Sequence, residues 1–196
     1  MAGVISLSSF DGTASARIQT DVGFNLFDWQ ANGNRSLLWS HPDFSGGLQR
    51  PSGSGIPILF PFPGRIAGSQ FVWEGTTYVV DSDDGRGNAI HGFVYNHPWH
   101  AEQTAENSVR GIFRAADVDP TILDQWPADF ELTTEYTLES RRLVSQFTIR
   151  SFERPLPCGL GLHPYFRIKL QPDAAEVTLR APVFHRWPLE NMNPTG

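Results

Sequence analysis

Polar and apolar residues alternate with a period of two along much of the chain, most clearly over residues 130–150. Over 130–139, apolar, aromatic and threonine positions form one face, and glutamate and threonine positions form the other. This period is typical of a β-strand with one buried and one solvated side. The turn-forming run ESRR at 139–142 follows, and the alternation resumes over 143–150. The pattern therefore predicts a long antiparallel hairpin.

Turn-forming sequences such as FDGT, ANGN, WEGT and DSDDGRGN divide the rest of the chain into short segments, and helical periodicity is nearly absent. Further strands are predicted at 3–8, 13–19, 22–29, 36–39, 70–73, 76–80, 99–104, 109–116, 157–162 and 175–180. Many short strands at this spacing predict an all-β sandwich or barrel. Because no internal repeat or linker interrupts the chain, we expect a single domain over residues 1–196.

Three segments break the alternation and are the candidates for chemistry. Residues 52–68, SGSGIPILFPFPGRIAG, are apolar and rich in proline, which cannot donate to a strand ladder. We expect a strand near 56–60 and an ordered loop after it. Residues 87–99 and 158–168 each place a histidine beside glycine or proline at the end of an apolar run.

Composition narrows the classes of function. The formal net charge of −6 and the lack of a basic stripe with spaced aromatics argue against a nucleic-acid partner. The single cysteine, Cys158, excludes an internal disulfide and a multi-thiolate metal site, and its apolar neighbours predict a buried side chain. The N-terminus lacks the features of a signal peptide and no apolar run could span a bilayer, so we expect a cytoplasmic protein without membrane contact.

Three of the six histidines, His91, His97 and His100, fall within ten positions. Three neutral imidazoles could bind zinc. A turn at 96–98 would separate His91 from His100, however, and no neighbouring acid could support a ligand. We therefore predict no metal, and we assign His97 and His100 to the surface or to strand ends. No GxSxG motif supports covalent catalysis.

His91 and His163 are candidates for acid–base chemistry, because histidine exchanges protons near neutral pH. Each follows an apolar run and precedes a tight turn, where an imidazole can stand at the rim of a cleft. Arg65 follows FPFPG, and in so apolar a segment it should meet an acid or a polar ligand. Alternatively, both histidines are hydrogen-bonded turn residues and Arg65 reaches solvent. Spacing alone favours this second interpretation.

Aromatic residues surround these candidates. The three segments contain Phe60, Phe62, Phe93, Trp99, Tyr165 and Phe166. An apolar wall with a few convergent polar groups is typical of a small-molecule pocket. It is equally typical of a sandwich core, which is the more frequent explanation for any single phenylalanine.

The motifs GIPILFPFPGRIAG, NAIHGFVYNHPW and GLHPYF, in this order, resemble the aldose 1-epimerase (galactose mutarotase-like) family, and the predicted hairpin fits between the last two. The resemblance runs from near the N-terminus to the last residues. It implies a β-supersandwich of large twisted antiparallel sheets with a sugar-binding cleft on a concave face. It also implies interconversion of the α and β anomers of an aldose, without metal or organic cofactor.

The resemblance also implies roles for individual residues. His163 would be the general acid that protonates the ring oxygen, and His91 would bind and polarise the sugar near the reacting centre. Arg65 would hold sugar hydroxyls. The predicted substrate-binding set is Arg65, Asn88, Phe93 and Tyr165. The implied partner is a monosaccharide, a hexose such as glucose or galactose.

One feature departs from the family pattern. The family's base is a glutamate far beyond the HPYF motif, whereas this sequence ends at LENMNPTG, shortly after His163. NPTG itself resembles a mid-chain loop of the family, so the chain resembles the first part of a longer protein. We do not assign the role to Glu190; the base lies on another segment or another chain, or catalysis is lost. Strands without their partners would leave open edges, which predicts a homodimer or strand exchange.

Two other functions remain open. A non-catalytic carbohydrate-binding protein would keep Arg65, His91 and the aromatic residues but lack the base. A hexose-6-phosphate 1-epimerase would need cations to hold phosphate, and Arg50 and Arg86 flank the relevant segments. A purely structural β-protein is a further alternative.

Overall fold

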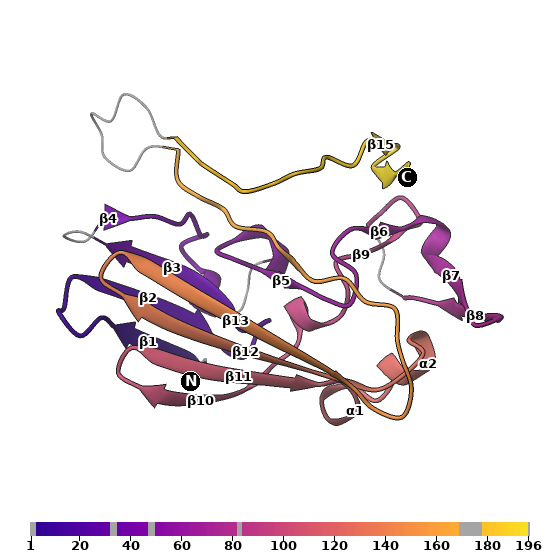
Figure 1. The fold of residues 1–196 in the computed structure, drawn as a ribbon, viewed down its shortest axis with the longest axis horizontal. Coiled ribbons are helices and arrows are strands. Elements are labelled where there is room, and N and C mark those ends of the chain that lie inside the picture. The colour runs from indigo at the N-terminus through magenta and orange to yellow at the C-terminus, as the bar shows by residue number, and fades with distance from the viewer. Residues whose placement is uncertain (1–2, 32–34, 47–49, 82–83, 169–177, 196) are drawn as a thin grey trace.

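The computed structural model describes residues 3–31, 35–46, 50–81, 84–168 and 178–195. Its elements are almost all β-strands, which confirms the predicted all-β class. Two four-stranded antiparallel sheets form the frame, and several two-stranded ladders complete it. Figure 1 shows the long strands on one side of the molecule and most of the short ladders gathered beyond their ends.

The first sheet holds its strands in chain order: β1 (Val4–Ser8), β2 (Ala14–Gln19), β3 (Asn25–Ala31) and β4 (Arg35–Ser36). Along β2 and β3 most buried residues are apolar, and Ile18 and Leu26 are fully buried, whereas Gln19 and Asn25 are buried polar residues. The pairing shifts register between Arg17 and Ile18. Such a bulge re-aims neighbouring side chains.

The second sheet is β10 (His100–Ala105), β11 (Ser108–Arg114), β12 (Phe130–Glu139) and β13 (Arg142–Ser151), also in chain order. The predicted hairpin is confirmed, with an unbroken register from Phe130 opposite Ser151 to Glu139 opposite Arg142. Burial alternates strictly along β12, as the sequence pattern predicted. A helix of one turn, α1 (Ala115–Val118), replaces the predicted end of the preceding strand, and a second one, α2 (Ile122–Gln125), follows it.

The short ladders bring together segments that are distant in the sequence. They are β5 (Ile58–Leu59) with β14 (Gly161–Leu162), β6 (Arg65–Ile66) with β9 (Ala89–Ile90), β7 (Gln70–Trp73) with β8 (Thr76–Val79), and β15 (Leu189–Glu190) with β16 (Asn193–Pro194). Four 3₁₀ turns connect them: η1 (Phe44–Gly46), η2 (Pro51–Gly53), η3 (Ala67–Ser69) and η4 (Val94–Asn96).

Aromatic rings fill the core between the sheets and the short ladders. Phe24 stacks on Trp99 and Tyr136 at centroid distances of 5.4 and 5.3 Å. Gly111 on β11 makes room for this ring, because a Cβ there would lie 2.8 Å from Phe24. Phe60 meets Phe130 edge-on at 5.0 Å. Each such side chain stabilises the fold by roughly 1.5–3 kcal/mol through burial.

Four of the six aromatic residues noted in the sequence belong to this core. These are Phe60, Phe62, Phe93 and Trp99, all buried. Phe166, by contrast, is exposed. For these four residues the sandwich-core explanation was therefore the correct one.

Three strand predictions and one burial prediction need correction. Over 36–39 and 157–162 only the ends form ladders, in β4 and β14, because the rest of each stretch runs extended without a continuous partner strand. Beyond β4, Leu38 makes only an isolated bridge, to Phe166. Of the strand predicted at 175–180, residues 175–177 lie outside the described residues and the remainder forms no strand. Cys158, expected to be buried, is exposed.

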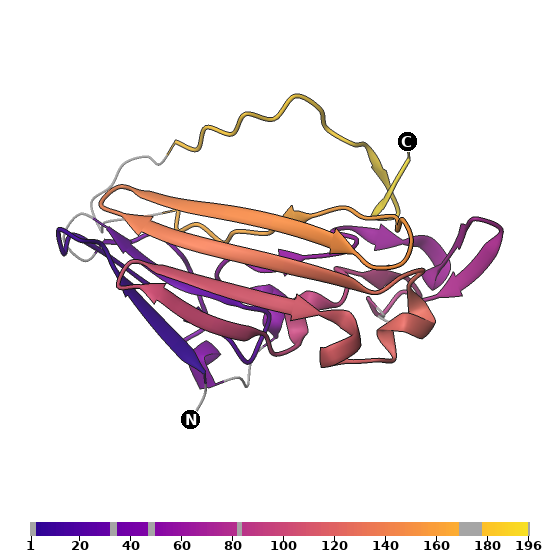
Figure 2. The ribbon, with the colours of Figure 1, turned by 60° about the horizontal axis from the view of Figure 1, so that its bottom comes forward.

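Much apolar surface lies open along the last part of the chain. β13 ends its sheet, and Val144 and Ile149 on it are exposed. Figure 2 shows the C-terminal segment as an extended stretch of chain that stands away from the two sheets. Its exposed apolar residues are Leu179, Val183, Phe184, Trp187, Leu189 and Met192. In the described part of the chain, every helix falls short of the length and hydropathy that a bilayer crossing requires.

Candidate functional site

His91 stands at the end of β9 in a strained turn. His91 and Gly92 both have a positive φ, 72° and 73°, a conformation that is costly for a residue with a side chain. The turn packs on the distant segment that follows β5, since the N–H of Phe93 donates to the carbonyl of Phe60 at 2.8 Å. A Cβ on Gly92 would lie 2.0 Å from that carbonyl oxygen, so only glycine fits. The turn therefore fixes the direction of the His91 imidazole.

The surroundings of His91 define its protonation. Burial lowers its pKa below the ordinary 6.5, and the positive charges of His163, Arg65 and Arg50 lower it further, against a raising effect of the bond to Pro63. His91 is therefore neutral at pH 7. Its Nδ1 lies 3.1 Å from the carbonyl oxygen of Pro63, which can only accept, so Nδ1 carries the hydrogen. Nε2 then presents a lone pair that can accept a hydrogen bond from a hydroxyl.

His163 is brought beside His91 by the strand segment that follows β14. Their ring centroids are 6.3 Å apart, and Tyr165 stacks on His163 at 4.9 Å. Backbone hydrogen bonds hold this segment on both sides. On one side the N–H groups of His163 and Tyr165 donate to Pro57 and Gly55. On the other side, the N–H of Trp39 donates to Tyr165 and that of Arg167 donates to Leu37.

Arg65 meets an acid, as its apolar setting predicted. Its Nε donates to Oδ2 of Asp84 at 2.6 Å, and the two side chains are 19% and 2% exposed. The hydrogen bond from Arg65 holds the pKa of Asp84 well below its usual range. Asp84 is therefore ionised at neutral pH and too weak a base to remove a hydroxyl proton efficiently. β6 pairs Arg65 with Ile90, next to His91.

The structure gathers most, but not all, of the predicted substrate-binding residues near the two histidines. Asn88 lies by Asp84, to which its Nδ2 donates at 3.3 Å. The hydroxyl of Tyr165 donates to the carbonyl of Ser52 at 3.0 Å. Phe93 instead lies in the core, where its ring meets Phe62 and Trp126 edge-on. Its contact with a substrate stays a prediction.

Sequence reasoning missed two neighbours of the site. Tyr95, on η4, places its ring edge-on to His91 at 5.9 Å. Asp84 lies in the run DSDDGRGN, whose glycines and acids indicate only a turn. The expectation that an acid meets Arg65 gave the kind of partner but not the residue, because the pairing of β6 with β9 decides which acid is in reach.

No carboxylate of the described residues is hydrogen-bonded or ion-paired to His91 or His163. Glu190 lies exposed on β15. His97 faces another part of the fold: its Nδ1 is 2.7 Å from the Phe93 carbonyl and its Nε2 is 3.4 Å from Asp119. These contacts give His97 a structural setting, apart from the two paired imidazoles.

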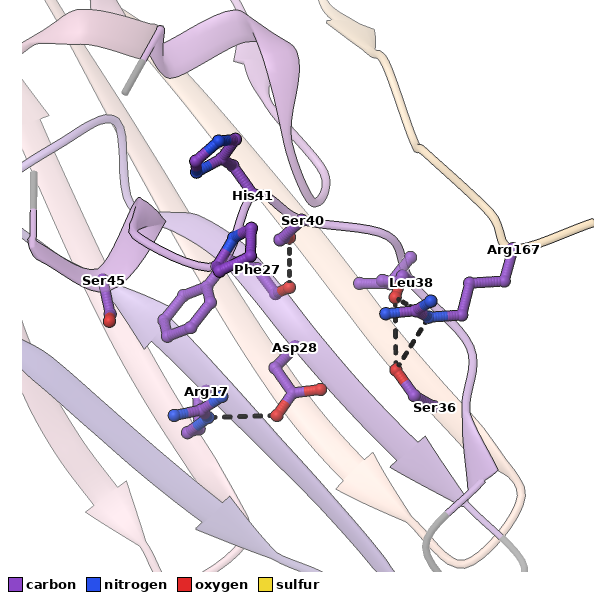
Figure 3. A pocket seen from close by; sticks show the side chains of 10 residues that line it. Arg17, Phe27, Asp28, Ser36, Leu38, Ser40, His41, Ser45 and Arg167 are labelled. Atoms are coloured by element: carbon purple, nitrogen blue, oxygen red, sulfur yellow. Dashed lines mark hydrogen bonds and ion pairs between the residues drawn. The ribbon is translucent and has the colours of Figure 1, made fainter. Parts of the chain in front are cut away.

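A second hollow lies on the outer face of the first sheet (Figure 3). Its polar groups mostly bind one another: Arg17 pairs with Asp28 at 3.0 Å, and Nε of Arg167 donates to the Leu38 carbonyl at 2.8 Å. Ser40 donates to the carbonyl of Phe27. This internal pairing makes the hollow a weaker candidate than the two histidines, for whose rings the described residues supply only one hydrogen-bond partner, the Pro63 carbonyl on Nδ1 of His91.

Comparison with known proteins identifies the family of the chain and the class of its all-β fold. The aldose 1-epimerase family model matches residues 8–196. The chain therefore belongs to the aldose 1-epimerase family. It is 28% identical over 116 residues to the plasmid and chromosomal LacX proteins of Lactococcus lactis subsp. lactis, a match that covers 58% of this chain and 37% of LacX.

Solved structures share the fold. The Slr1438 protein of Synechocystis sp. PCC 6803 is 26% identical with a TM-score of 0.71, covering 86% of this chain and 56% of that one. A galactose mutarotase-like protein from Clostridium acetobutylicum is 21% identical with a TM-score of 0.68, and the match covers 88% of this chain and 56% of that one. Galactose 1-epimerase from Lactobacillus acidophilus NCFM is 16% identical with a TM-score of 0.64, and the match covers 85% of this chain and 53% of that one. The fold is thus galactose mutarotase-like, and the chain spans about half the length of these structures.

Proposed function

We propose that this chain carries the sugar-binding and proton-donating part of an aldose 1-epimerase, which interconverts the α and β anomers of a free hexose such as glucose or galactose. The observation that carries the proposal is the 6.3 Å approach of the His91 and His163 rings beside Arg65. The shared family supports the same reaction class.

In the proposed reaction, His163 protonates the ring oxygen while a carboxylate base removes the proton of the anomeric hydroxyl. The bond between C1 and the ring oxygen breaks, giving the open-chain aldehyde. Rotation about C1–C2 and reclosure on the other face, with both protons returned, yields the second anomer. Positioned acids and bases of this kind contribute roughly 10²–10⁴-fold each.

The neutral Nε2 of His91 accepts a hydrogen bond from a sugar hydroxyl, and Arg65 donates to sugar oxygens. The carboxylate base comes from a further segment or another chain, because Asp84 is committed to Arg65. We infer a cytoplasmic setting, where free hexoses are metabolised.

Polarimetry of freshly dissolved α-glucose or α-galactose tests the proposal. With the proton donor present and the base supplied only by water or a second copy, the chain should accelerate the decay of optical rotation in part, and His163→Ala should return it to the uncatalysed rate. His41→Ala removes a partly exposed histidine in the second hollow and should leave the rate unchanged. A chain that binds sugar without changing the rate is instead a carbohydrate-binding protein.

A second candidate is a hexose-6-phosphate 1-epimerase. The observation that favours it is the charge of Arg50, which acts on His91 together with that of Arg65. The Nε of Arg50 donates to Ser52, so the side chain is anchored close to the site. Glucose 6-phosphate should then bind more tightly than glucose, and Arg50→Gln should remove the difference. Equal binding of both sugars contradicts this candidate.

We also propose that a second copy of the chain covers the open edge of β13. Val144 and Ile149 give this edge an apolar character, and unpaired edges tend to add a strand. Light scattering after size-exclusion chromatography should give a dimer, and Val144→Lys should shift it to monomer. A clean monomer at high concentration would contradict the proposal.

A further inference from the structure

Three arginine–aspartate pairs in the described residues share one geometry, in which the arginine Nε donates to a carboxylate Oδ2. They are Arg17–Asp28, Arg65–Asp84 and Arg114–Asp129. The Asp84 side chain is the most buried of the three acids, at 2% exposure against 15% for Asp28 and 10% for Asp129. A carboxylate this buried is costly unless every oxygen is bound.

The two oxygens of Asp84 have different main partners. Oδ1 accepts the backbone N–H of Arg86 at 2.8 Å and that of Asn88 at 3.2 Å, which closes the turn 84–88. The backbone N–H of Asp84 donates to the carbonyl of Asn88 at 2.8 Å and closes it a second time. Oδ2 accepts the Nε–H of Arg65 at 2.6 Å and a longer bond from the side-chain amide of Asn88 at 3.3 Å. The turn therefore fixes the carboxylate independently of the arginine.

A guanidinium has five N–H donors in a rigid plane, and Asp84 occupies only the one on Nε. Among the described residues, no acceptor is recorded for the four N–H groups on the Nη atoms of Arg65. The charge of Arg65 is also felt at His91. A flexible arginine anchored through Nε is held in place before any ligand arrives, so less conformational freedom is lost on binding.

We propose that Asp84 is a positioning residue, which holds Arg65 by its Nε so that the Nη groups stay beside His91 for an incoming sugar. This inference rests on the proposed function for the identity of the ligand. The contact between Asp84 and Arg65 itself does not depend on that function.

Asp84→Asn separates the two tasks of the side chain. Asparagine keeps an oxygen that accepts the turn N–H groups, but it places an amide N–H₂ opposite the Nε–H of Arg65, where both groups are donors. Asp129→Asn is the matched control. Oδ2 of Asp129 binds Arg114 at 3.0 Å and its Oδ1 accepts the N–H of Ala116 at 3.0 Å, away from the histidines.

Titration of the full chain with glucose and galactose by calorimetry measures the effect. Asp84→Asn should weaken binding by about 10- to 100-fold, the range for a lost hydrogen bond to a charged group. Asp129→Asn should stay within about twofold of the unchanged chain. In an Arg65→Gln background, Asp84→Asn should add almost nothing. Unchanged affinity in Asp84→Asn, or a loss fully additive to that of Arg65→Gln, overturns the inference.

A measurement without ligand separates this inference from the proposed function. NMR titration of the His91 ring should show its pKa rising toward the ordinary value in Asp84→Asn and in Arg65→Gln, because the guanidinium charge moves away. Asp129→Asn should leave it unchanged. If the unmodified chain binds no sugar but the His91 pKa rises, the proposed function fails and the hold of Asp84 on Arg65 stands. An unchanged His91 pKa overturns it.

Asp84→Ser provides a second variant if Asp84→Asn does not fold. A serine hydroxyl can also accept the N–H groups of a turn, and it removes the carboxylate completely. It should weaken sugar binding and raise the His91 pKa in the same way, and an unchanged pair of values overturns the inference equally.

Discussion

The long sheet β10–β13 and the short ladders around His91 are built on opposite principles. In the sheet, ten residues of β12 pair with ten of β13 without a break, and neighbours in the chain are neighbours in space. Around the site, short contacts join three distant segments, 57–65, 88–93 and 161–167. These contacts are ladders of two residues, a turn at positive φ and hydrogen bonds from side chains to backbone. A repeated pattern gives rigidity, whereas sparse and specific contacts let distant residues converge on one point.

The comparison predicts where substitutions act. Changes in the sheet should lower the free energy of unfolding and leave the geometry of the site intact. Changes in the short ladders should alter sugar binding by more than their effect on stability suggests.

The largest loss of stability is expected from Phe130→Ala. Phe130 is fully buried and meets both Phe60 and Phe113. Removing the ring should lower the free energy of unfolding by about 3–5 kcal/mol. Urea denaturation measures the loss, and sugar affinity of the remaining folded protein should be close to normal. A loss below about 1 kcal/mol would show that the sheet does not depend on this contact.

Gly92→Ala should be costly for a different reason. Its φ of 73° and the Phe60 carbonyl at 2.0 Å from the new Cβ force the turn to move, at about 2–4 kcal/mol. Gly12→Ala is the control: φ is 69° but no atom lies within 4 Å, so only strain of about 1–2 kcal/mol remains. Sugar binding should fall only in Gly92→Ala. Equal effects of the two variants on binding would contradict the role of the turn.

His91 should make stability depend on pH. Its pKa is lowered in the folded chain, so the unfolded chain binds more protons between that value and 6.5. The free energy of unfolding should therefore rise with pH through this window and fall on acidification. His91→Gln should flatten the slope, measured by denaturation from about pH 5 to 8. His100→Gln, at an exposed strand start, should leave the slope as it is.

The smallest effect is expected from Glu135→Gln on the solvent face of the sheet. Glu135 pairs with Arg110 at 2.6 Å, but both side chains are well exposed. Such pairs contribute about 0.5 kcal/mol or less, and salt should reduce that further. Thermal unfolding at low and high salt measures it. A larger change would mean that the outer face contributes more than its exposure implies.

The same contrast explains what the sequence could predict. The hairpin at 130–150 was predictable because the alternation of buried and exposed positions follows directly from the alternation of apolar and polar residues along the sequence. The family motifs located His91, His163 and Arg65, and the apolar setting of Arg65 predicted that an acid or a polar ligand would meet it. Neither could identify Asp84, because that choice depends on how β6 meets β9.

Phe93, named in the predicted substrate-binding set, packs against Trp126, and its contact with a sugar stays a prediction. One prediction of burial failed for the same physical reason. Cys158 lies in an apolar run but is exposed, since that stretch crosses the surface as a single extended segment. Local sequence shows how apolar a segment is, but not which side of it the fold covers.

The segment that carries His163 is bonded along both flanks, to 55–57 and to 37–39, although only its first residues count as strand. The proposed proton donor, His163, therefore lies on a backbone segment that is hydrogen-bonded to a neighbouring segment on each side. The His163 imidazole can therefore change its position only by rotation of its own side chain. A sugar must bind within reach of the imidazole, because the backbone of His163 is held in place. A substitution that displaces the backbone of 37–39 would then also displace the segment of His163, because backbone hydrogen bonds join the two segments.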